Sequence, residues 1–282
     1  MTDRHKLGTP RDRALGAELR SIREQAGMSL TRVCSQLHWN VSTLSRLERG
    51  MRHVSPEAVM GLAVIYGLPP DRRKQLLRWA KTSPSSGWWD SGPMGMPGEL
   101  GAMTSYEEDS KRMTKWAPGL LPGLLQTSEY AAAVMRDYGH GEEKVQALVD
   151  ARLHRQALLD RRGVDYTAII GINALRNMLS SRKDFVEQLW HVRCLSKRDG
   201  ISIRLVERPT MHAMSAWYLL DFDRFGSMVH LEHLRSATFL FDEEAKPYQE
   251  VKRRLLEIAL PPAETTTRLE VITKMCEDGS WP

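Results

Sequence analysis

The sequence predicts two folded regions of different class: an all-α region of five short helices, followed by an α+β region with a small, mostly antiparallel sheet. Three observations lead to this prediction. The chain has 282 residues, more than the roughly 100–200 of one ordinary domain. Apolar residues recur at helical spacings early in the chain, whereas later stretches also alternate as strands do. A segment rich in Gly, Pro and Ser separates the two.

The net charge of the chain changes at about the same place as its composition. We place the all-α region at 1–81, the linker at 82–104 and the α+β region at 105–282. The first region carries 15 Lys and Arg against 7 Asp and Glu, and the rest of the chain carries 25 against 28, so the net charges are +8 and −3. Because Lys and Arg release the counterions condensed on nucleic acid, the compact basic region indicates a polyanion-binding part.

The first two helices are predicted from an apolar stripe and from end signals. Helix one covers 14–26, and Gly27 stops it. Its stripe consists of Leu15, Leu19, Ile22 and Ala26. Ser29 is a suitable N-cap for a second helix, which ends near His38.

Three further short helices complete this region. Asn40 caps the third helix, and Gly50 ends it. The fourth opens at Ser55, with Pro56 in the first turn. The fifth covers 70–81 and is rich in Arg and Lys.

Helices and strands are mixed in the region after the linker. Periodicity predicts helices at 105–116, 128–138, 142–162, 173–179, 182–198, 243–260 and 263–277. Short apolar runs predict strands at 166–170, 201–206, 216–221, 228–231 and 238–241. Because the last three strands follow one another closely, we expect them to pair antiparallel.

Several protein classes find no support in the sequence. The three cysteines are widely spaced and form no C-x-x-C pair, which argues against disulfides and a zinc site. No stretch approaches the ~18 apolar residues of a membrane span. There is no phosphate-binding or dinucleotide-binding glycine motif, and His230 and His233 would point to opposite faces of a strand. We therefore expect a cytoplasmic, nucleoid-associated protein that is not an enzyme and has no catalytic residues, metal or cofactor.

One segment carries a specific motif. Residues 29–50, SLTRVCSQLHWNVSTLSRLERG, contain the end of one helix, a short turn and an Asn-capped second helix. This segment resembles the helix-turn-helix of the lambda-repressor-like (XRE) family of bacterial and phage regulators. The resemblance implies a sequence-specific transcriptional regulator whose partner is a double-stranded DNA operator.

The third helix is the predicted reader of DNA bases. Placing residues every 100° puts Leu44 and Leu47 inward, because they share one face of the helix. A helix of this size fits the major groove, where each base pair shows a distinct pattern of donors and acceptors. The predicted base contacts are Val41, Ser42, Ser45 and Arg46.

Other residues are predicted to hold the DNA backbone. Ser29 and Asn40 stand at helix N-termini, where side chain and backbone N–H groups together can bind a phosphate. Arg49, Arg52 and His53 follow the third helix as further phosphate contacts.

The resemblance also assigns a structural ion pair and shows two departures from the family. It implies that Glu48 turns inward to pair with Arg23 of the first helix. His38 stands in the turn where the family usually has Gly, so either His38 adopts a left-handed backbone or the turn shifts. Leu30 stands where many members carry a phosphate-binding Gln.

The region from about 106 to 272 resembles the domain of unknown chemistry that follows such a helix-turn-helix in actinobacterial, antitoxin-like or developmental regulators. The resemblance is carried by PGLLQTSEYA at 122–131, by RLHRQALL at 152–159 and by the 229–232 strand. It implies a small acidic or neutral protein partner encoded next to this chain. We expect this region to dimerise, to sense a signal or to bind such a partner. A homodimer is expected because one helix-turn-helix head buries only a modest surface on DNA and its sites are usually two-fold repeats. The alternative function is therefore an antitoxin-like interaction protein that acts mainly by binding this partner.

Overall fold

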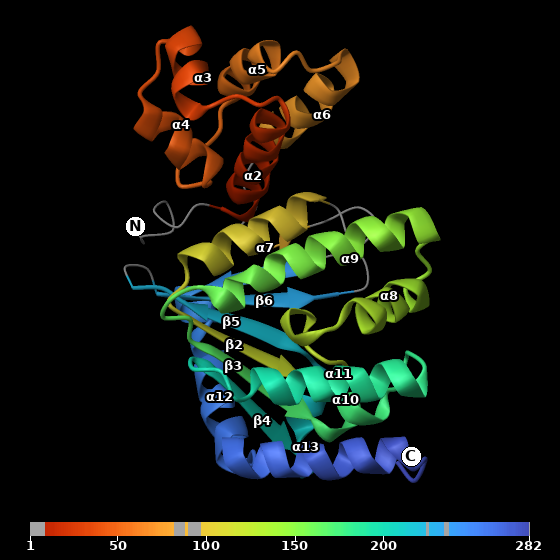
Figure 1. Ribbon diagram of the computed structural model, residues 1–282. Helices are drawn as coiled ribbons and strands as arrows, with labels where there is room; N and C mark the ends of the chain where they lie inside the picture. The colour runs from red at the N-terminus through yellow and green to blue at the C-terminus, as the bar shows by residue number, and fades with distance from the viewer. Residues whose placement is uncertain (1–8, 82–87, 90–96, 224–225, 234–236, 282) are drawn as a thin grey trace. The chain divides into compact units, whose positions relative to one another are not determined.

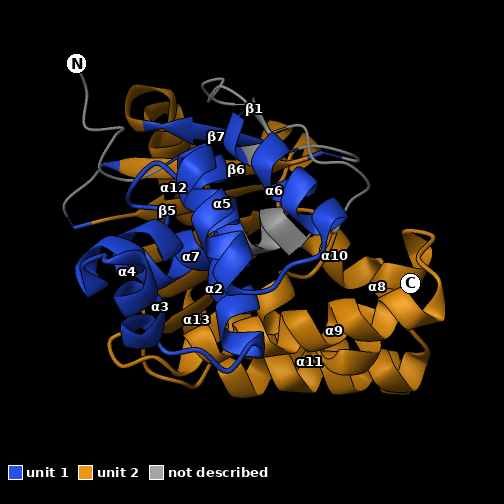
Figure 2. Cartoon of the chain, turned by 90° about the horizontal axis from the view of Figure 1, so that it is seen from above, with its two compact units in different colours: residues 1–109, 223–226, 233–241 blue, residues 110–222, 227–232, 242–282 orange. Residues whose placement is uncertain are grey.

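A computed structural model describes residues 9–81, 88–89, 97–223, 226–233 and 237–281. Within these residues the chain divides into two compact units (Figure 2). Unit 1 comprises 1–109, 223–226 and 233–241, and unit 2 comprises 110–222, 227–232 and 242–282. In the described part of the chain, no helix has both the length and the apolar character needed to cross a bilayer.

Unit 1 is mainly helical. Its helices are α2 (Pro10–Gln25), α3 (Leu30–Leu37), α4 (Val41–Glu48), α5 (Pro56–Ile65), α6 (Pro70–Lys81) and α7 (Pro97–Asp109). The five helices expected within 1–81 correspond to α2–α6. Helix α7 adds to them in the described part of unit 1, so the count of five is not exact.

Local signals explain where these helices begin. The hydroxyl oxygens of Thr9, Ser29 and Ser55 each accept a hydrogen bond from a backbone N–H in the first turn of α2, α3 and α5. Proline occupies the first turn of α2 and α5, where its missing N–H costs no intrahelical bond. The apolar stripes then bury a common core that includes Leu15, Leu19, Val33, Leu44, Leu62 and Leu76.

Helix α7 begins inside the stretch predicted as a linker and packs against α2. The centroid of its Tyr106 ring lies 5.9 Å from that of the Phe239 ring. Phe239 belongs to strand β7 (Ala237–Phe241) of the same unit. Strand β1 (Trp88–Trp89) pairs antiparallel with β7. The remaining residues of the predicted linker lie outside the described residues, and the boundaries 1–81, 82–104 and 105–282 stay a prediction.

Unit 2 contains a mixed sheet with the strand order β6-β5-β2-β3-β4. The strands are β2 (Arg112–Ala117), β3 (Tyr166–Gly171), β4 (Ile201–Val206), β5 (Trp217–Asp221) and β6 (Ser227–Glu232). Ladders β2–β3 and β3–β4 are parallel, whereas β2–β5 and β5–β6 are antiparallel. The prediction of a small, mostly antiparallel sheet is therefore wrong. Helices connect β2 to β3 and β3 to β4, and such crossovers produce parallel neighbours.

The helices of unit 2 are α8 (Ser128–Asp137), α9 (Glu142–Gln156), α10 (Ile172–Arg176), α11 (Arg182–Leu195), α12 (Lys246–Ile258) and α13 (Pro262–Glu277). Helices α9 and α11 lie on the viewer's side of the sheet in Figure 1. Short 3-10 turns stand at Gly123–Leu125, Ala157–Asp160, Met211–Met214 and Asp242–Glu244. The α+β class predicted for this region is confirmed.

The helix predicted at 105–116 is wrong in its second half. Helix α7 ends at Asp109, and Arg112–Ala117 form β2 instead. Strand β2 hydrogen-bonds to β3 on one side and to β5 on the other, and Met113 and Trp116 are buried. Pairing with two distant strands outweighs the local helical spacing of this segment.

Candidate nucleic-acid interface

The turn between α3 and α4 takes the shape that the motif requires. Ser29 caps α3, and His38 ends it with φ 53° and ψ 37°, which is the left-handed conformation. The N–H of Trp39 then donates to the carbonyl of Cys34 at 3.0 Å. His38 thus adopts the backbone that glycine usually supplies, at a cost of roughly 1–2 kcal/mol relative to glycine.

Close backbone contact fixes α4 against α2. A Cβ atom on Gly16 of α2 would lie 2.4 Å from the carbonyl oxygen of Leu47 and 2.7 Å from that of Glu48. Gly50, which ends α4 with φ +66°, approaches the backbone of Arg13 as closely. Only glycine fits at these two positions, because any side chain would push α4 away from α2.

The predicted base-contact residues lie on the outer side of α4. Leu44 and Leu47 are buried in the core of unit 1. Val41, at the first position of α4, is 42% exposed. Ser42 and Arg46 are also exposed, whereas Ser45 is half-buried. Val41, Ser42 and Arg46 are therefore accessible on the outer side of α4, and Ser45 is less so.

The two N-cap residues differ in how they use their side chains. Ser29 Oγ accepts a hydrogen bond from the backbone N–H of Arg32 at 3.2 Å, so this oxygen serves the helix. Asn40 caps α4 through its backbone conformation, and its side chain makes no capping hydrogen bond. Both residues are exposed. The first backbone N–H groups of α4 therefore lie beside an amide that is not used for capping.

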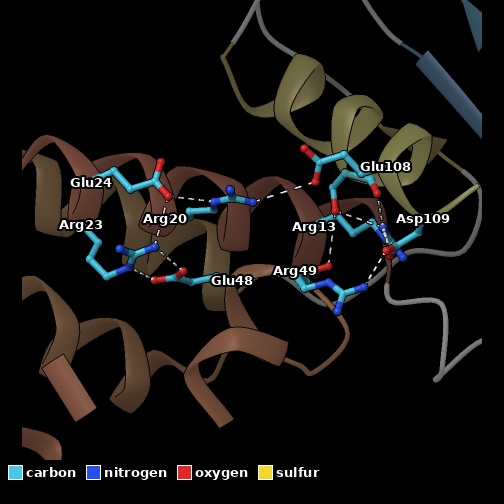
Figure 3. Close-up of polar contacts among 9 residues, drawn as sticks. Arg13, Arg20, Arg23, Glu24, Glu48, Arg49, Glu108 and Asp109 are labelled. Atoms are coloured by element: carbon cyan, nitrogen blue, oxygen red, sulfur yellow. Dashed lines mark hydrogen bonds and ion pairs between the residues drawn. The ribbon is translucent and has the colours of Figure 1, made fainter. Parts of the chain in front are cut away.

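Glu48 and Arg23 lie as the resemblance implies. Arg23 Nε is 2.7 Å from Glu48 Oε1 and Arg23 Nη2 is 3.0 Å from Glu48 Oε2, with both residues buried (Figure 3). Arg23 Nη1 also donates to the carbonyl of Met28 at 2.8 Å. The hydrogen bond with Glu48 raises the pKa of Arg23. This bidentate pair ties the end of α4 to α2.

The predicted phosphate contacts after α4 are exposed, but two of them have partners within unit 1. Arg49 Nη2 lies 2.7 Å from Asp109 Oδ1 of α7. His53 Nδ1 lies 2.9 Å from Asp12 Oδ1 of α2. Arg52 is exposed as well.

Sequence reasoning missed the contact between α2 and α7. Arg13 is fully buried, and its Nη1 donates to the carbonyl oxygen of Ser105 at 2.7 Å. The same nitrogen lies 2.9 Å from Asp109 Oδ2 (Figure 3). The guanidinium also stacks over the Tyr106 ring, 4.1 Å from the ring centroid. Arg20 lies 3.9 Å from Glu108 further along. The one local signal was the acidic run Glu107–Asp109 at the end of α7.

A groove of about 720 Å³ lies in unit 2. Its charged lining is mainly acidic: Glu129, Asp137, Glu142 and Asp184 against Arg136. Arg136 is already paired with Glu142 at 2.7 Å. A partner with an acidic contact surface would therefore meet like charge in this groove.

The helices of unit 1 contain a helix-turn-helix domain, which supports a DNA-binding regulator as the class of the protein. Residues 14–76 match the family model described as a helix-turn-helix domain, which confirms this part of the sequence prediction. Residues 100–271 match the model of a domain of unknown function (DUF5753). That match covers more than half of the chain, and the chain belongs to the DUF5753 family. No curated protein and no solved structure matches it.

Proposed function

We propose that this chain is a sequence-specific transcriptional regulator of the lambda-repressor-like (XRE) type, which reads operator DNA by placing α4 in the major groove. The observation that carries the proposal is the accessible face of α4, where Val41, Ser42 and Arg46 lie together beside the N-terminal turn. Recognition helices of this motif contact base edges with their N-terminal residues. The basic charge of residues 1–81 supports binding to a polyanion.

Each outward side chain has a role that its chemistry supports. Val41 offers an apolar contact for a thymine methyl group. The Ser42 hydroxyl can donate to or accept from a base edge, and Arg46 has the planar donor pair that matches guanine. Ser45 is assigned a lesser part, because it is half-buried.

The test is selection of binding sites from randomised double-stranded DNA by the full chain and three variants. Ser42→Ala and Arg46→Ala should relax the preference at particular base pairs and weaken binding to the selected site by about 1–3 kcal/mol. Arg52→Ala should weaken binding to all sequences alike and reduce the salt dependence by about one unit. Unchanged base preferences in Ser42→Ala and Arg46→Ala would show that α4 is not the reader.

We also propose that the protein binds its operator as a homodimer. A single helix-turn-helix head buries only a modest surface on DNA, and sites of such proteins are usually two-fold repeats spaced by one helical turn. Light scattering of the DNA complex should give two chains per operator. One chain per site, at concentrations where binding is saturated, would contradict this proposal.

The antitoxin-like alternative is less well supported than the regulator. It rests on the similarity of 122–131 and 152–159 to actinobacterial regulators. The similarity implies an acidic or neutral partner, and the acidic lining of the groove does not complement an acidic one.

A further inference from the structure

The groove of about 720 Å³ in unit 2 is lined by α8, α9 and the start of α11. Along α8 and α9 its lining residues recur every three or four positions, so each helix turns one face toward the groove. The two helices are antiparallel neighbours joined by a short connection (Figure 1). Gln156 Nε2 at the end of α9 donates to the carbonyl oxygen of Gln126, just before α8, at 2.6 Å. The groove is therefore elongated along α8.

Carboxylates without partners lie near both ends of α8 in this groove. Glu129 is in the first turn of α8, and Asp137 is its last residue. About 12 Å of helix axis separates them, at 1.5 Å per residue. Both side chains are exposed, and within the part of the chain that the structure describes neither has a hydrogen-bond or ion-pair partner. Two negative charges are thus available at separate points of one groove.

The other charged lining residues leave the groove acidic. Glu142 accepts hydrogen bonds from Arg136 at 2.7 and 2.9 Å, so the guanidinium that lines the groove is already paired. Asp184 accepts from the neutral hydroxyl of Ser181 at 2.6 Å and keeps its charge unbalanced. Three cations close in the chain do not line the groove: Lys144, Arg182 and Lys183. The charged lining residues therefore carry a net charge of −3.

The middle of the groove is small and apolar on the side of α8. Ala132 and Ala133 lie halfway between Glu129 and Asp137 and both line the groove. The apolar lining from the other elements consists of Val145, Val149 and Leu179. An elongated ligand would therefore meet a carboxylate near each end of α8 and methyl groups between them.

The size of the groove favours a small molecule over a protein. Pockets for small ligands measure about 300–1,000 Å³, and this groove lies within that range. A stable protein interface uses about 20–30 residues on each side, whereas 14 residues of the described chain line this groove. In the described residues, no group of three or more His, Cys, Asp or Glu side chains could hold a metal ion. An organic cation is the remaining class that the charge fits.

We propose that this groove binds a linear polyamine, with one ammonium group at Glu129, another at Asp137 and the methylene chain over Ala132 and Ala133. Each ammonium forms charge-assisted hydrogen bonds with its carboxylate, which are about twice as strong as those between neutral groups. The methylene groups between the amines gain free energy by covering the alanine methyl groups. A cation with a single charged group would reach only one of the two carboxylates.

The test is isothermal titration calorimetry of the full chain with spermidine, compared with butylamine and magnesium chloride at equal ionic strength. We expect saturable binding of one spermidine per chain. Butylamine has one amine and should bind at least tenfold more weakly, because a hydrogen bond to a charged group contributes about 1.5–3 kcal/mol. Magnesium should also bind at least tenfold more weakly, since it cannot span the groove.

Variants of the two carboxylates locate the site. Glu129→Gln and Asp137→Asn should each weaken spermidine binding about tenfold or more. Asp199→Asn is the matched control for loss of one negative charge, because Asp199 is exposed in the turn before β4 and does not line the groove. It should leave the Kd unchanged. The proposal is overturned if the three variants bind spermidine alike, since the attraction would then depend only on the overall charge.

Ala133→Leu tests the middle of the groove without changing any charge. The larger side chain would fill the space over which the methylene chain lies, and leucine is nearly as good a helix former as alanine. Spermidine binding should weaken several-fold while the Tm of the free protein stays close to that of the wild type. An unchanged Kd in Ala133→Leu would contradict the proposed pose.

Two further outcomes overturn the proposal. The first is no saturable binding of spermidine up to millimolar concentrations. The second is saturable binding of a lysine-rich helical peptide without any binding of spermidine, which would make the groove a docking site for a basic protein segment. The titrations contain no DNA, so their result is independent of the proposed regulator function.

Discussion

Arg49 and Asp109 form an ion pair of 2.7 Å that joins the end of the helix-turn-helix to α7. Helix α7 lies largely within the DUF5753 match of 100–271, yet it belongs to the same compact unit as the helix-turn-helix. Asp109 also faces the buried Arg13 of α2 at 2.9 Å. The first helix of the DUF5753 match is therefore bonded to a residue that we predict to contact DNA phosphate.

This relationship predicts that DNA competes with Asp109 for Arg49. Asp109→Asn should raise the affinity for operator DNA about two- to fivefold, since an exposed ion pair is worth about 0.2–1 kcal/mol. Titration of fluorescent operator DNA at low and moderate salt measures the change. In the double variant Asp109→Asn/Arg49→Ala the gain should disappear. An equal gain with and without Arg49 would mean that Asp109 acts through its general charge and not through this pair.

The buried pair of Arg23 and Glu48 should be essential for stability. Glu48→Ala leaves the buried Arg23 guanidinium with only the exposed Glu24 carboxylate, at 3.3 Å, and breaking a buried pair typically costs about 3–5 kcal/mol. Replacing both residues, as in Arg23→Met/Glu48→Leu, should recover most of that loss because no buried charge remains. Urea unfolding measures both variants, with Arg253→Ala on the exposed surface as a control that should leave the midpoint unchanged. If Glu48→Ala unfolds at the wild-type midpoint, the pair does not hold α4 to α2.

The sequence allowed the α3-turn-α4 motif to be predicted because its signals are local. Caps, an apolar stripe and a glycine at the end of α4 all lie within about twenty residues of one another. The pairing of Arg13 with α7 was not predictable in this way, since the partners are 92 residues apart and Arg13 lies on the side of α2 opposite Leu15. The spacing of apolar residues alone would assign this side of α2 to the solvent.

The same reasoning applies in unit 2. Strand β2 was predicted as a helix, because its strand conformation depends on pairing with β3 and β5, which lie far along the chain. The Lys115–Glu232 pair spans 117 positions and depends on the register of β2, β5 and β6. Arg152 and Arg155 were recognised as one helix face, but the sequence does not show that their charges help to lower the pKa of Glu232.

Acid should remove the stabilising effect of Glu232. The pKa of Glu232 in the folded chain is about 2, below the ordinary value of about 4.3 in an unfolded chain. A depressed pKa means that its stabilising effect is fully present above about pH 4.3 and is lost as the pH falls toward 2. The Tm difference between wild type and Glu232→Gln, measured in chloride buffers, should therefore shrink between about pH 5 and pH 2.5. A difference that stays constant over this range would contradict the depressed pKa.

Ser29 and Asn40 should separate helix capping from phosphate binding. Ser29 Oγ accepts from the N–H of Arg32, so Ser29→Ala should lower the stability of the fold by about 1 kcal/mol, as loss of an N-cap does. The Asn40 side chain makes no such bond, and Asn40→Ala should change the Tm less than Ser29→Ala does. Asn40→Ala should instead weaken binding to operator and to unrelated DNA alike, because a phosphate contact carries no sequence information. Thermal unfolding and DNA titration of the two variants provide the comparison. If Asn40→Ala lowers the Tm as much as Ser29→Ala and leaves DNA affinity unchanged, Asn40 is a structural cap and not a phosphate contact.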